Sequence, residues 1–192
     1  MSKFKIVKTG IEDLLVIEPT VFGDKRGFFL ESYNHKELSD VGFGKTFVQD
    51  NFSRSTKGVL RGLHFQKQHP QGKLVKVARG KVFDVAVDLR KGSSTFGKWH
   101  GVILDDEDHW MFYVPEGFAH GFLVLSQIAD FQYKCTDYYH PEDEGGILWN
   151  DPEIDIQWPL EDITPLLSPK DEKLPLLGNT EIPFVYEGGN QS

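Results

Sequence analysis

The sequence predicts a mainly β protein, built as a sandwich or barrel with only a few short helices. The chain has 192 residues, and its 15 Phe, 6 Tyr and 4 Trp favour strands over helices. Its 19 Gly and 10 Pro supply turns between short apolar runs. These turn signals recur at short, fairly regular spacing, which is typical of an all-β sandwich or barrel.

The clearest strand covers residues 82–89, where apolar side chains alternate with Asp84 and Asp88. In an expected strand at residues 47–52, the same alternation places Gln49 and Asn51 on one face. The other extended segments are expected at residues 14–18, 28–33, 60–65, 74–78, 99–104, 110–114, 121–125 and 131–139.

Helices are expected to be few and short. Asn34 can cap a helix over residues 34–41, the best candidate in the chain. Beyond about residue 141 the alternation weakens and four prolines exclude a long helix, so short helical turns are expected to pack on the β body. The sequence therefore predicts a single domain over residues 1–186, followed by a disordered tail at residues 187–192.

Composition excludes several classes of function. Asp and Glu number 29 against 21 Lys and Arg, and this net charge of −8 argues against non-specific binding of nucleic acid. An anionic ligand would need a local cluster of positive side chains. The single cysteine, Cys135, rules out an intrachain disulfide and suits a reducing cytoplasm. The sequence has neither an apolar run long enough to span a membrane nor a signal peptide, so we expect a cytoplasmic protein.

Residues 59–73 bring a guanidinium (Arg61), an imidazole (His64) and an ammonium (Lys73) into one strand-and-turn unit. This combination suits a site where an anionic substrate loses a proton. In a regular strand, however, Arg61 and His64 would point to opposite faces. Gly62 lies between them and is a natural position for a bulge that would turn both side chains inward.

Residues 115–122 contain the pattern Pro-x-Gly-x-x-His, which ends at His120 and resembles the second motif of the cupin superfamily. The first cupin motif has a counterpart around His64. Metal-binding cupins carry a further His and a Glu there, whereas this chain has Phe65 and Lys67 or Gln68, so the ligands of a three-residue metal site are missing. His120 is expected to donate a hydrogen bond to an anionic ligand.

Tyr133 and Tyr139 lie six residues apart and would share one face of an unbroken strand. In a substrate cavity, one hydroxyl can donate a proton and the other ring can stack on a base. A core location for both rings is the alternative. Asp171 could orient His64 if the C-terminal segment folds back onto the strand.

Several motifs together resemble the dTDP-4-dehydrorhamnose 3,5-epimerase family. The resemblance runs in order from about residue 6 to residue 177. It rests on Arg-Gly-Phe-Phe-Leu-Glu at 26–31, Val-Gln-Asp-Asn at 48–51, Arg-Gly-Leu-His-Phe-Gln at 61–66, residues 115–122, residues 133–139, Leu-Trp-Asn-Asp-Pro at 148–152 and Lys-Asp at 170–171.

The resemblance implies a cupin-type jelly roll, a homodimer, and no metal or other cofactor. It implies as substrate dTDP-4-dehydro-6-deoxy-D-glucose, inverted at C3 and C5 to give dTDP-4-dehydro-L-rhamnose. His64 would be the base, Tyr133 the acid and Asp171 the partner of His64. Lys73 would lie near the sugar keto oxygen and Tyr139 would stack on thymine. The remaining substrate-binding residues would be Arg26, Glu31, Gln49, Asp50, Asn51, Arg61, His120, Glu144 and Lys170, with Arg26 and Glu31 reaching in from the second subunit.

Three alternatives stay open from the sequence. A related enzyme could invert only C3 or only C5, because that choice depends on how long the intermediate is held. A non-catalytic cupin could bind a sugar nucleotide without needing all four catalytic candidates. A metal-dependent cupin is the third, and a metal content analysis would distinguish it.

Overall fold

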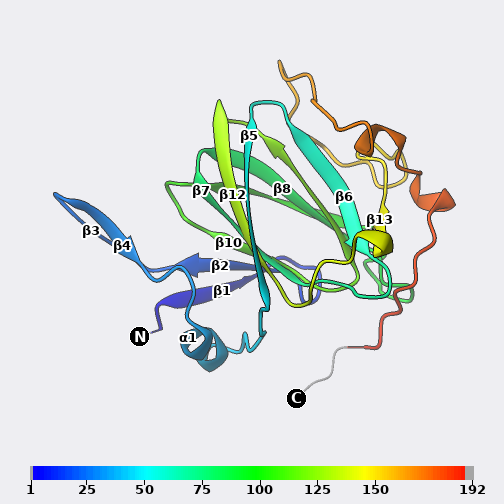
Figure 1. Cartoon of the computed structure of the whole chain (residues 1–192). Helices are drawn as coiled ribbons and strands as arrows, with labels where there is room; N and C mark the ends of the chain where they lie inside the picture. Colours follow the sequence, from blue (N-terminus) through cyan, green and yellow to red (C-terminus); the bar gives the residue numbers. More distant parts are fainter. Residues whose placement is uncertain (1, 189–192) are drawn as a thin grey trace.

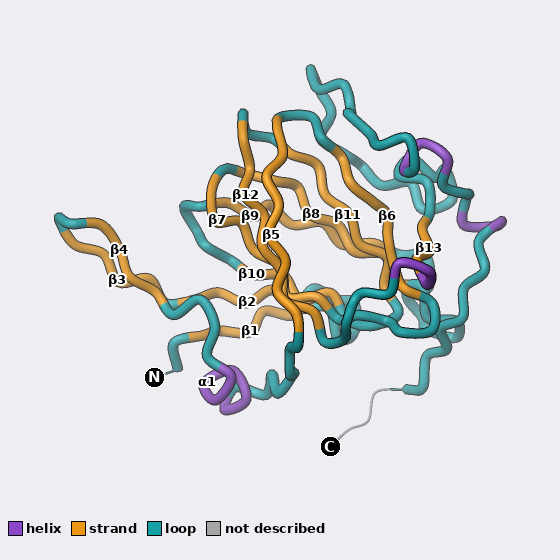
Figure 2. The backbone as a smooth tube through the Cα atoms, viewed as in Figure 1, coloured by secondary structure: helices purple, strands orange, loops and turns teal. Residues whose placement is uncertain are grey.

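The computed structural model describes residues 2–188 of the chain, and in that part strands predominate (Figures 1 and 2). The strands are β1 (Phe4–Lys8), β2 (Leu15–Pro19), β3 (Val21–Asp24), β4 (Gly27–Leu30), β5 (Gln49–Thr56), β6 (Leu60–Gln66), β7 (Lys73–Arg79), β8 (Lys81–Asp88), β9 (Trp99–Asp105), β10 (Met111–Val114), β11 (Phe118–Val124), β12 (Ile128–Cys135) and β13 (Glu144–Gly146). The helical elements are α1 (His35–Asp40) and the 3₁₀ turns η1 (Pro141–Asp143), η2 (Asp171–Lys173) and η3 (Leu177–Asn179).

Two antiparallel sheets form the body of the molecule. One has six strands in the order β1-β2-β10-β7-β12-β5, and the other has five in the order β13-β6-β11-β8-β9. Strands distant in sequence lie side by side in both sheets, as expected for a jelly roll. β3 and β4 pair only with each other and project from the body as a hairpin (Figure 1). The predicted cupin-type β sandwich with short helices is confirmed.

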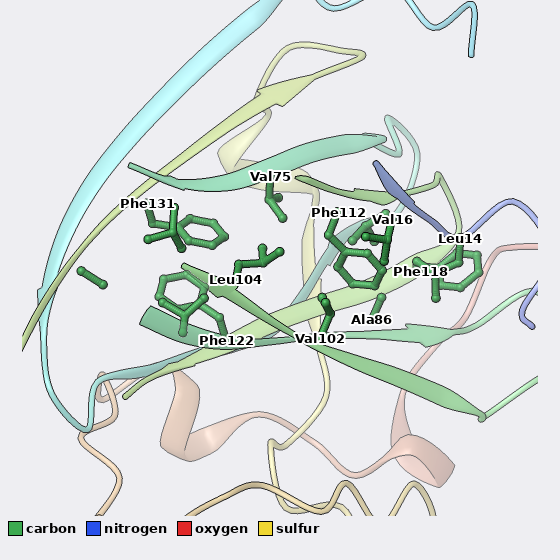
Figure 3. Close-up of a cluster of buried hydrophobic side chains, with 14 of the residues drawn as sticks. Leu14, Val16, Val75, Ala86, Val102, Leu104, Phe112, Phe118, Phe122 and Phe131 are labelled. Atoms are coloured by element: carbon green, nitrogen blue, oxygen red, sulfur yellow. The ribbon is translucent and has the colours of Figure 1, made fainter. Parts of the chain in front are cut away.

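Alternation along the strands sorts the side chains between the inside and the outside of the sandwich. The inward faces supply the main apolar core, which includes Val75, Phe112, Phe122 and Phe131 (Figure 3). On β8 the inward positions include Asp84, while the neighbouring apolar residues face outward. The core therefore fills only part of the space between the sheets, and polar side chains occupy the rest.

The outer faces of the two sheets are covered differently. The C-terminal segment, residues 147–188, covers the outer face of the five-stranded sheet, against which side chains such as Ile154 and Trp158 pack. Helix α1 covers the six-stranded sheet with Leu38. This helix begins where the sequence predicted, since the side chain of Asn34 accepts a hydrogen bond from the backbone N–H of Glu37 at 3.2 Å. No helix among residues 2–188 has both the length and the apolar character to cross a membrane.

The structure departs from the sequence prediction near the N-terminus and at the end of β12. Residues 21–27, for which the sequence predicted no strand, form strand β3 and the tight turn of its hairpin with β4. A first strand, β1, was not predicted. The strand predicted at 131–139 ends at Cys135, where its pairing with β5 and β7 also ends, opposite Gln49 and Lys73. Tyr139 therefore lies in a loop, and the argument that placed it on the same strand face as Tyr133 was wrong. The tail predicted at 187–192 falls mostly outside the described residues.

The predicted bulge at Gly62 is present. Arg61 pairs with Phe122 and His64 pairs with His120, so two residues of β6 stand opposite the single residue Gly121. This extra residue shifts the in–out alternation of β6 by one position. The side chains of Arg61 and His64 therefore point from the same face of the sheet. Gly62 has φ +121°, and a Cβ there would lie 2.6 Å from the Cα of Gly121.

We expect Gly62→Ala to destabilise the protein by on the order of 2–4 kcal/mol, because it combines a positive φ with a backbone clash. Gly10→Ala is the matched control, since Gly10 also has a positive φ of +92° but no heavy atom within 4 Å of the place that a Cβ would take. That variant should lose only about 1 kcal/mol. Urea unfolding of both variants measures the difference, and equal losses would show that the bulge is not tightly packed.

Candidate active site

The candidate site lies between the two sheets, where polar side chains on the inward faces replace the apolar core. β6 contributes Arg61 and His64, whose neighbours Leu63 and Phe65 pack in the outer cluster instead. β12 contributes Tyr133 from the opposite sheet. Other inward polar residues include Gln49 and Asn51 of β5, Gln66 of β6, Lys73 of β7, Asp84 of β8 and His120 of β11.

His64 contacts a buried carboxylate from a distant part of the chain. Its Nε2 lies 2.6 Å from Oδ1 of Asp171, which begins turn η2. The Asp171 side chain is 5% exposed and that of His64 is 33% exposed. Burial alone would raise the pKa of Asp171, but the hydrogen bond and charge of His64, with smaller contributions from Ser168 and Lys170, hold that pKa below its ordinary value. An ionised Asp171 accepts a hydrogen bond from Nε2–H of His64, which leaves Nδ1 unprotonated and able to take a proton.

A second His–Asp pair lies next to the first. The Nε2 of His120 is 2.8 Å from Oδ1 of Asp84, both side chains are buried, and His120 is the cross-strand neighbour of His64. Burial raises the pKa of Asp84, although His120 and Lys73 oppose that rise. Among the described residues, Oδ2 of Asp84 is a buried oxygen without a hydrogen-bond partner. Sequence reasoning did not select Asp84, although its place in an alternating apolar strand was a usable signal.

Lys73 opens β7, with the Asp84 carboxyl and the Cys135 thiol among its neighbours. Burial lowers the pKa of Lys73, and those two groups partly oppose the shift. Lys73 and His120 line the same small cavity. The arrangement provides a cation inside the sandwich, within a largely apolar frame that strengthens its interactions.

Tyr133 provides a neutral phenol. It is half-buried, and burial raises its pKa, as does the neighbouring Cys135, whereas Arg61 from the opposite sheet lowers it. Arg61 belongs to the five-stranded sheet and Tyr133 to the six-stranded sheet, so this effect acts from one wall of the sandwich on the other. A phenol kept neutral at physiological pH can donate a proton.

Three more of the predicted residues lie at the rim of this region. Arg61 is exposed and donates to Oγ of Ser55 at 3.2 and 3.3 Å. Gln49 accepts a hydrogen bond from the backbone N–H of Tyr139 at 3.0 Å, which ties the loop carrying Tyr139 to β5. Asn51 donates to Sγ of Cys135 at 3.5 Å.

The other predicted residues lie elsewhere. Asp50 is on the outer face of β5, where it contacts Lys134 at 2.8 Å. Arg26 lies at the tip of the β3–β4 hairpin and pairs with Asp24, while Glu31 follows β4 and contacts Lys3. Glu144 of β13 forms an ion pair with Lys170, next to Asp171. Within one copy of the chain, Arg26, Glu31 and Asp50 are not brought to the inward-facing cluster.

No three His, Cys, Asp or Glu side chains in residues 2–188 are grouped in a way that would hold a metal ion.

The low pKa of Asp171 has a consequence for stability. A carboxylate with a depressed pKa stabilises the fold at pH above the unfolded value of about 3.9, and that contribution is lost as the pH falls through its lower folded value. We expect Asp171→Asn to be less stable than the unchanged protein at about pH 7, with the gap shrinking below about pH 4. Urea unfolding across this pH range measures the gap, and a gap that stays constant down to the lowest pH would contradict the assignment.

Comparison with known proteins gives consistent matches over nearly the whole chain. The family model described as dTDP-4-dehydrorhamnose 3,5-epimerase matches residues 8–179. The dTDP-4-dehydrorhamnose 3,5-epimerase of Salmonella typhimurium is 57% identical over 174 residues, which cover 90% of this chain and 94% of that protein.

Solved structures agree with the sequence matches. A dTDP-6-deoxy-D-glucose-3,5-epimerase from Legionella pneumophila Philadelphia 1, in complex with dTDP-4-keto-L-rhamnose, is 54% identical with a TM-score of 0.92 and covers 96% of this chain and 100% of its own. A 3′-monoepimerase from Streptomyces bikiniensis, in complex with dTDP-quinovose, is 37% identical with a TM-score of 0.82 over 88% of this chain and 86% of its own. With agreement of this extent in sequence, fold and length, the chain belongs to the dTDP-4-dehydrorhamnose 3,5-epimerase family.

Proposed function

We propose that the protein converts dTDP-4-dehydro-6-deoxy-D-glucose to dTDP-4-dehydro-L-rhamnose by inverting the sugar at C3 and C5. The observation that carries the proposal is the 2.6 Å contact of His64 with the ionised Asp171, on the sheet that faces Tyr133. Base and acid candidates thus stand on opposite walls of one site. Family membership identifies the substrate class.

Both reacting carbons flank the C4 ketone, which explains how one set of residues can serve both inversions. Removing a proton from either carbon gives an enolate whose negative oxygen is the same C4 oxygen. Lys73 is the cation we assign to that oxygen, and a positioned donor of this kind contributes about 3–4 kcal/mol. His64 takes the proton at Nδ1, while Asp171 holds the ring in one tautomer and stabilises the imidazolium that forms.

Inversion requires the new proton to arrive from the opposite face of the ring. A second and different acid is therefore needed, and we assign this role to Tyr133, which belongs to the sheet opposite His64 and has a pKa raised by burial. Loss of the Tyr133 proton in this step would be aided by Arg61, whose positive charge favours the phenolate.

The diphosphate of the substrate must bind to a protein with a net charge of −8. Arg61 at the rim offers a guanidinium fork suited to phosphate oxygens, and we assign a further phosphate contact to Lys170, the neighbour of Asp171 in the sequence. We assign thymine stacking to Tyr139, and further polar contacts to Gln49, Asn51, His120 and Glu144.

We further propose a homodimer in which the β3–β4 hairpin carries Arg26 and Glu31 to the site of a second copy. The hairpin projects from the body (Figure 1), and Phe22, Phe28 and Phe29 on it are more than half exposed. Exposed aromatic side chains on a projecting hairpin need a partner surface. Asp50, on an outer sheet face, would bind substrate only if the assembly brings the nucleotide past that face. A single, buried cysteine fits the proposed cytoplasmic location.

A mono-epimerase is the nearest alternative, since a 3′-monoepimerase shares the fold. That monoepimerase is 37% identical to this chain, whereas the relatives at 54–57% identity reported above are 3,5-epimerases, which favours double inversion. A non-catalytic binding protein would have no need of the His64–Asp171 contact.

Proton NMR of the product distinguishes the first two reactions. We expect inversion at both C3 and C5, because both protons are acidified by the same ketone. A product inverted at one carbon alone would replace the 3,5-epimerase with the mono-epimerase.

The role of His64 as base is tested by deuterium exchange. We expect His64→Ala to lose solvent deuterium wash-in at C3 and C5 by on the order of 10²–10⁴-fold, the contribution typical of a positioned base. His35→Ala, an exposed histidine at the start of α1, is the matched control and should exchange normally. Exchange retained in the His64 variant would remove this residue from the role of base.

A further inference from the structure

Two connecting segments border the site at the end where Lys73 enters β7. The first, residues 67–72, joins β6 to β7 and so links His64 to Lys73. The second, residues 136–143, follows β12 and carries Tyr139. We call these the 67–72 turn and the 136–143 loop.

Gln66, the last residue of β6, bonds to both segments. Its Nε2 donates to the backbone oxygen of His69 in the 67–72 turn at 2.7 Å and to that of Tyr138 in the 136–143 loop at 3.3 Å. Its Oε1 accepts the backbone N–H of His140 at 2.7 Å. The two loop contacts lie on either side of Tyr139, so Gln66 holds the backbone that presents this ring.

The Gln66 side chain is committed to these contacts. The residue is 5% exposed, and both amide hydrogens and the amide oxygen have main-chain partners. Two carbonyl acceptors and one N–H donor also determine which end of the amide is nitrogen. Although Gln66 lines the cavity shared by Lys73 and His120, it has no free donor for a ligand.

Gln66 lies on the same strand and the same face as the candidate base, His64. It lies two residues after His64 in a regular part of β6, so the two side chains leave the same face. Around Gln66, secondary contacts join the same two segments. Asp143 accepts the backbone N–H groups of Gln68 and His69, and the rings of His69 and His140 stack with centroids 4.1 Å apart.

We propose that Gln66 is a positioning residue for nucleotide binding, which sets the location of Tyr139 relative to His64. The inference rests on the proposed function, because it takes Tyr139 to be the thymine platform. Gln66 itself touches neither base nor sugar. It acts by holding residues 138 and 140, so its loss should impair binding of the nucleotide more than chemistry on the sugar.

The test measures dTDP binding by calorimetry and deuterium wash-in at saturating substrate. We expect Gln66→Leu to weaken dTDP binding about tenfold or more, since three main-chain groups, two of them on either side of Tyr139, lose their partner. Turnover at saturation should change by less than about threefold, because His64, Lys73 and Tyr133 lie on strands that do not depend on Gln66. Gln157→Leu is the matched control: this exposed glutamine also donates to a backbone oxygen, that of Asp155 at 3.0 Å, and its loss should leave binding unchanged.

A double-mutant cycle separates positioning from a merely structural role. If Gln66 acts through Tyr139, Gln66→Leu should cause no further loss of dTDP affinity in a Tyr139→Ala background. Additive losses would overturn the proposal, as would unchanged dTDP affinity in Gln66→Leu. If Gln66→Leu does not fold, Gln66→Asn replaces it throughout, because the shorter amide cannot reach both segments.

The unchanged protein separates this inference from the proposed function. Binding of dTDP without deuterium exchange would overturn the epimerase reaction and leave the Gln66 proposal to be decided by the cycle. Absence of dTDP binding would overturn both.

Discussion

The one extra residue in β6 is the constraint on which the rest of the site depends. Without it, regular alternation would place Arg61 on the outer face whenever His64 faced inward. The bulge at Gly62 turns both side chains inward. At this point β6 packs against the backbone of β11 at Gly121. A glycine is needed there because no side chain fits between the two backbones. The electrostatic effect of Arg61 on Tyr133 follows from this local departure from regular pairing.

A polar interior between two sheets has an energetic cost, which the structure limits by pairing its buried charges. Asp84 faces His120 and Lys73, and Asp171 faces His64. The Asp84–His120 and Asp171–His64 pairs join residues 36 and 107 positions apart, so these pairs form only when the distant elements have folded together. The apolar core beside it, shown in Figure 3, supplies the stability that allows the site to remain polar.

Sequence reasoning found most of the inward-facing cluster because its members sit on strands with clear alternation. It identified Arg61, His64 and Tyr133 from pattern and motif, and it identified the need for an irregularity at Gly62. It missed Asp84, because a polar residue that alternates with apolar ones is usually on the solvent-facing side of a strand. It placed Tyr139 on β12, since nothing in residues 131–139 shows that the neighbouring strands stop at Cys135. Strand ends depend on partners, and partners are set by the fold.

The sequence by itself determined the fold class, the strand faces and the residue types available for proton transfer, because alternation, turn residues and charge are local properties of the chain. Only the tertiary structure decided which of those residues meet. The approach of Asp171 to His64 spans 107 positions, and the hydrogen bonds from Gln66 to the loop around Tyr139 span more than 70. Contacts of that length arise from sheet order and from the path of the C-terminal segment, which no short stretch of sequence encodes.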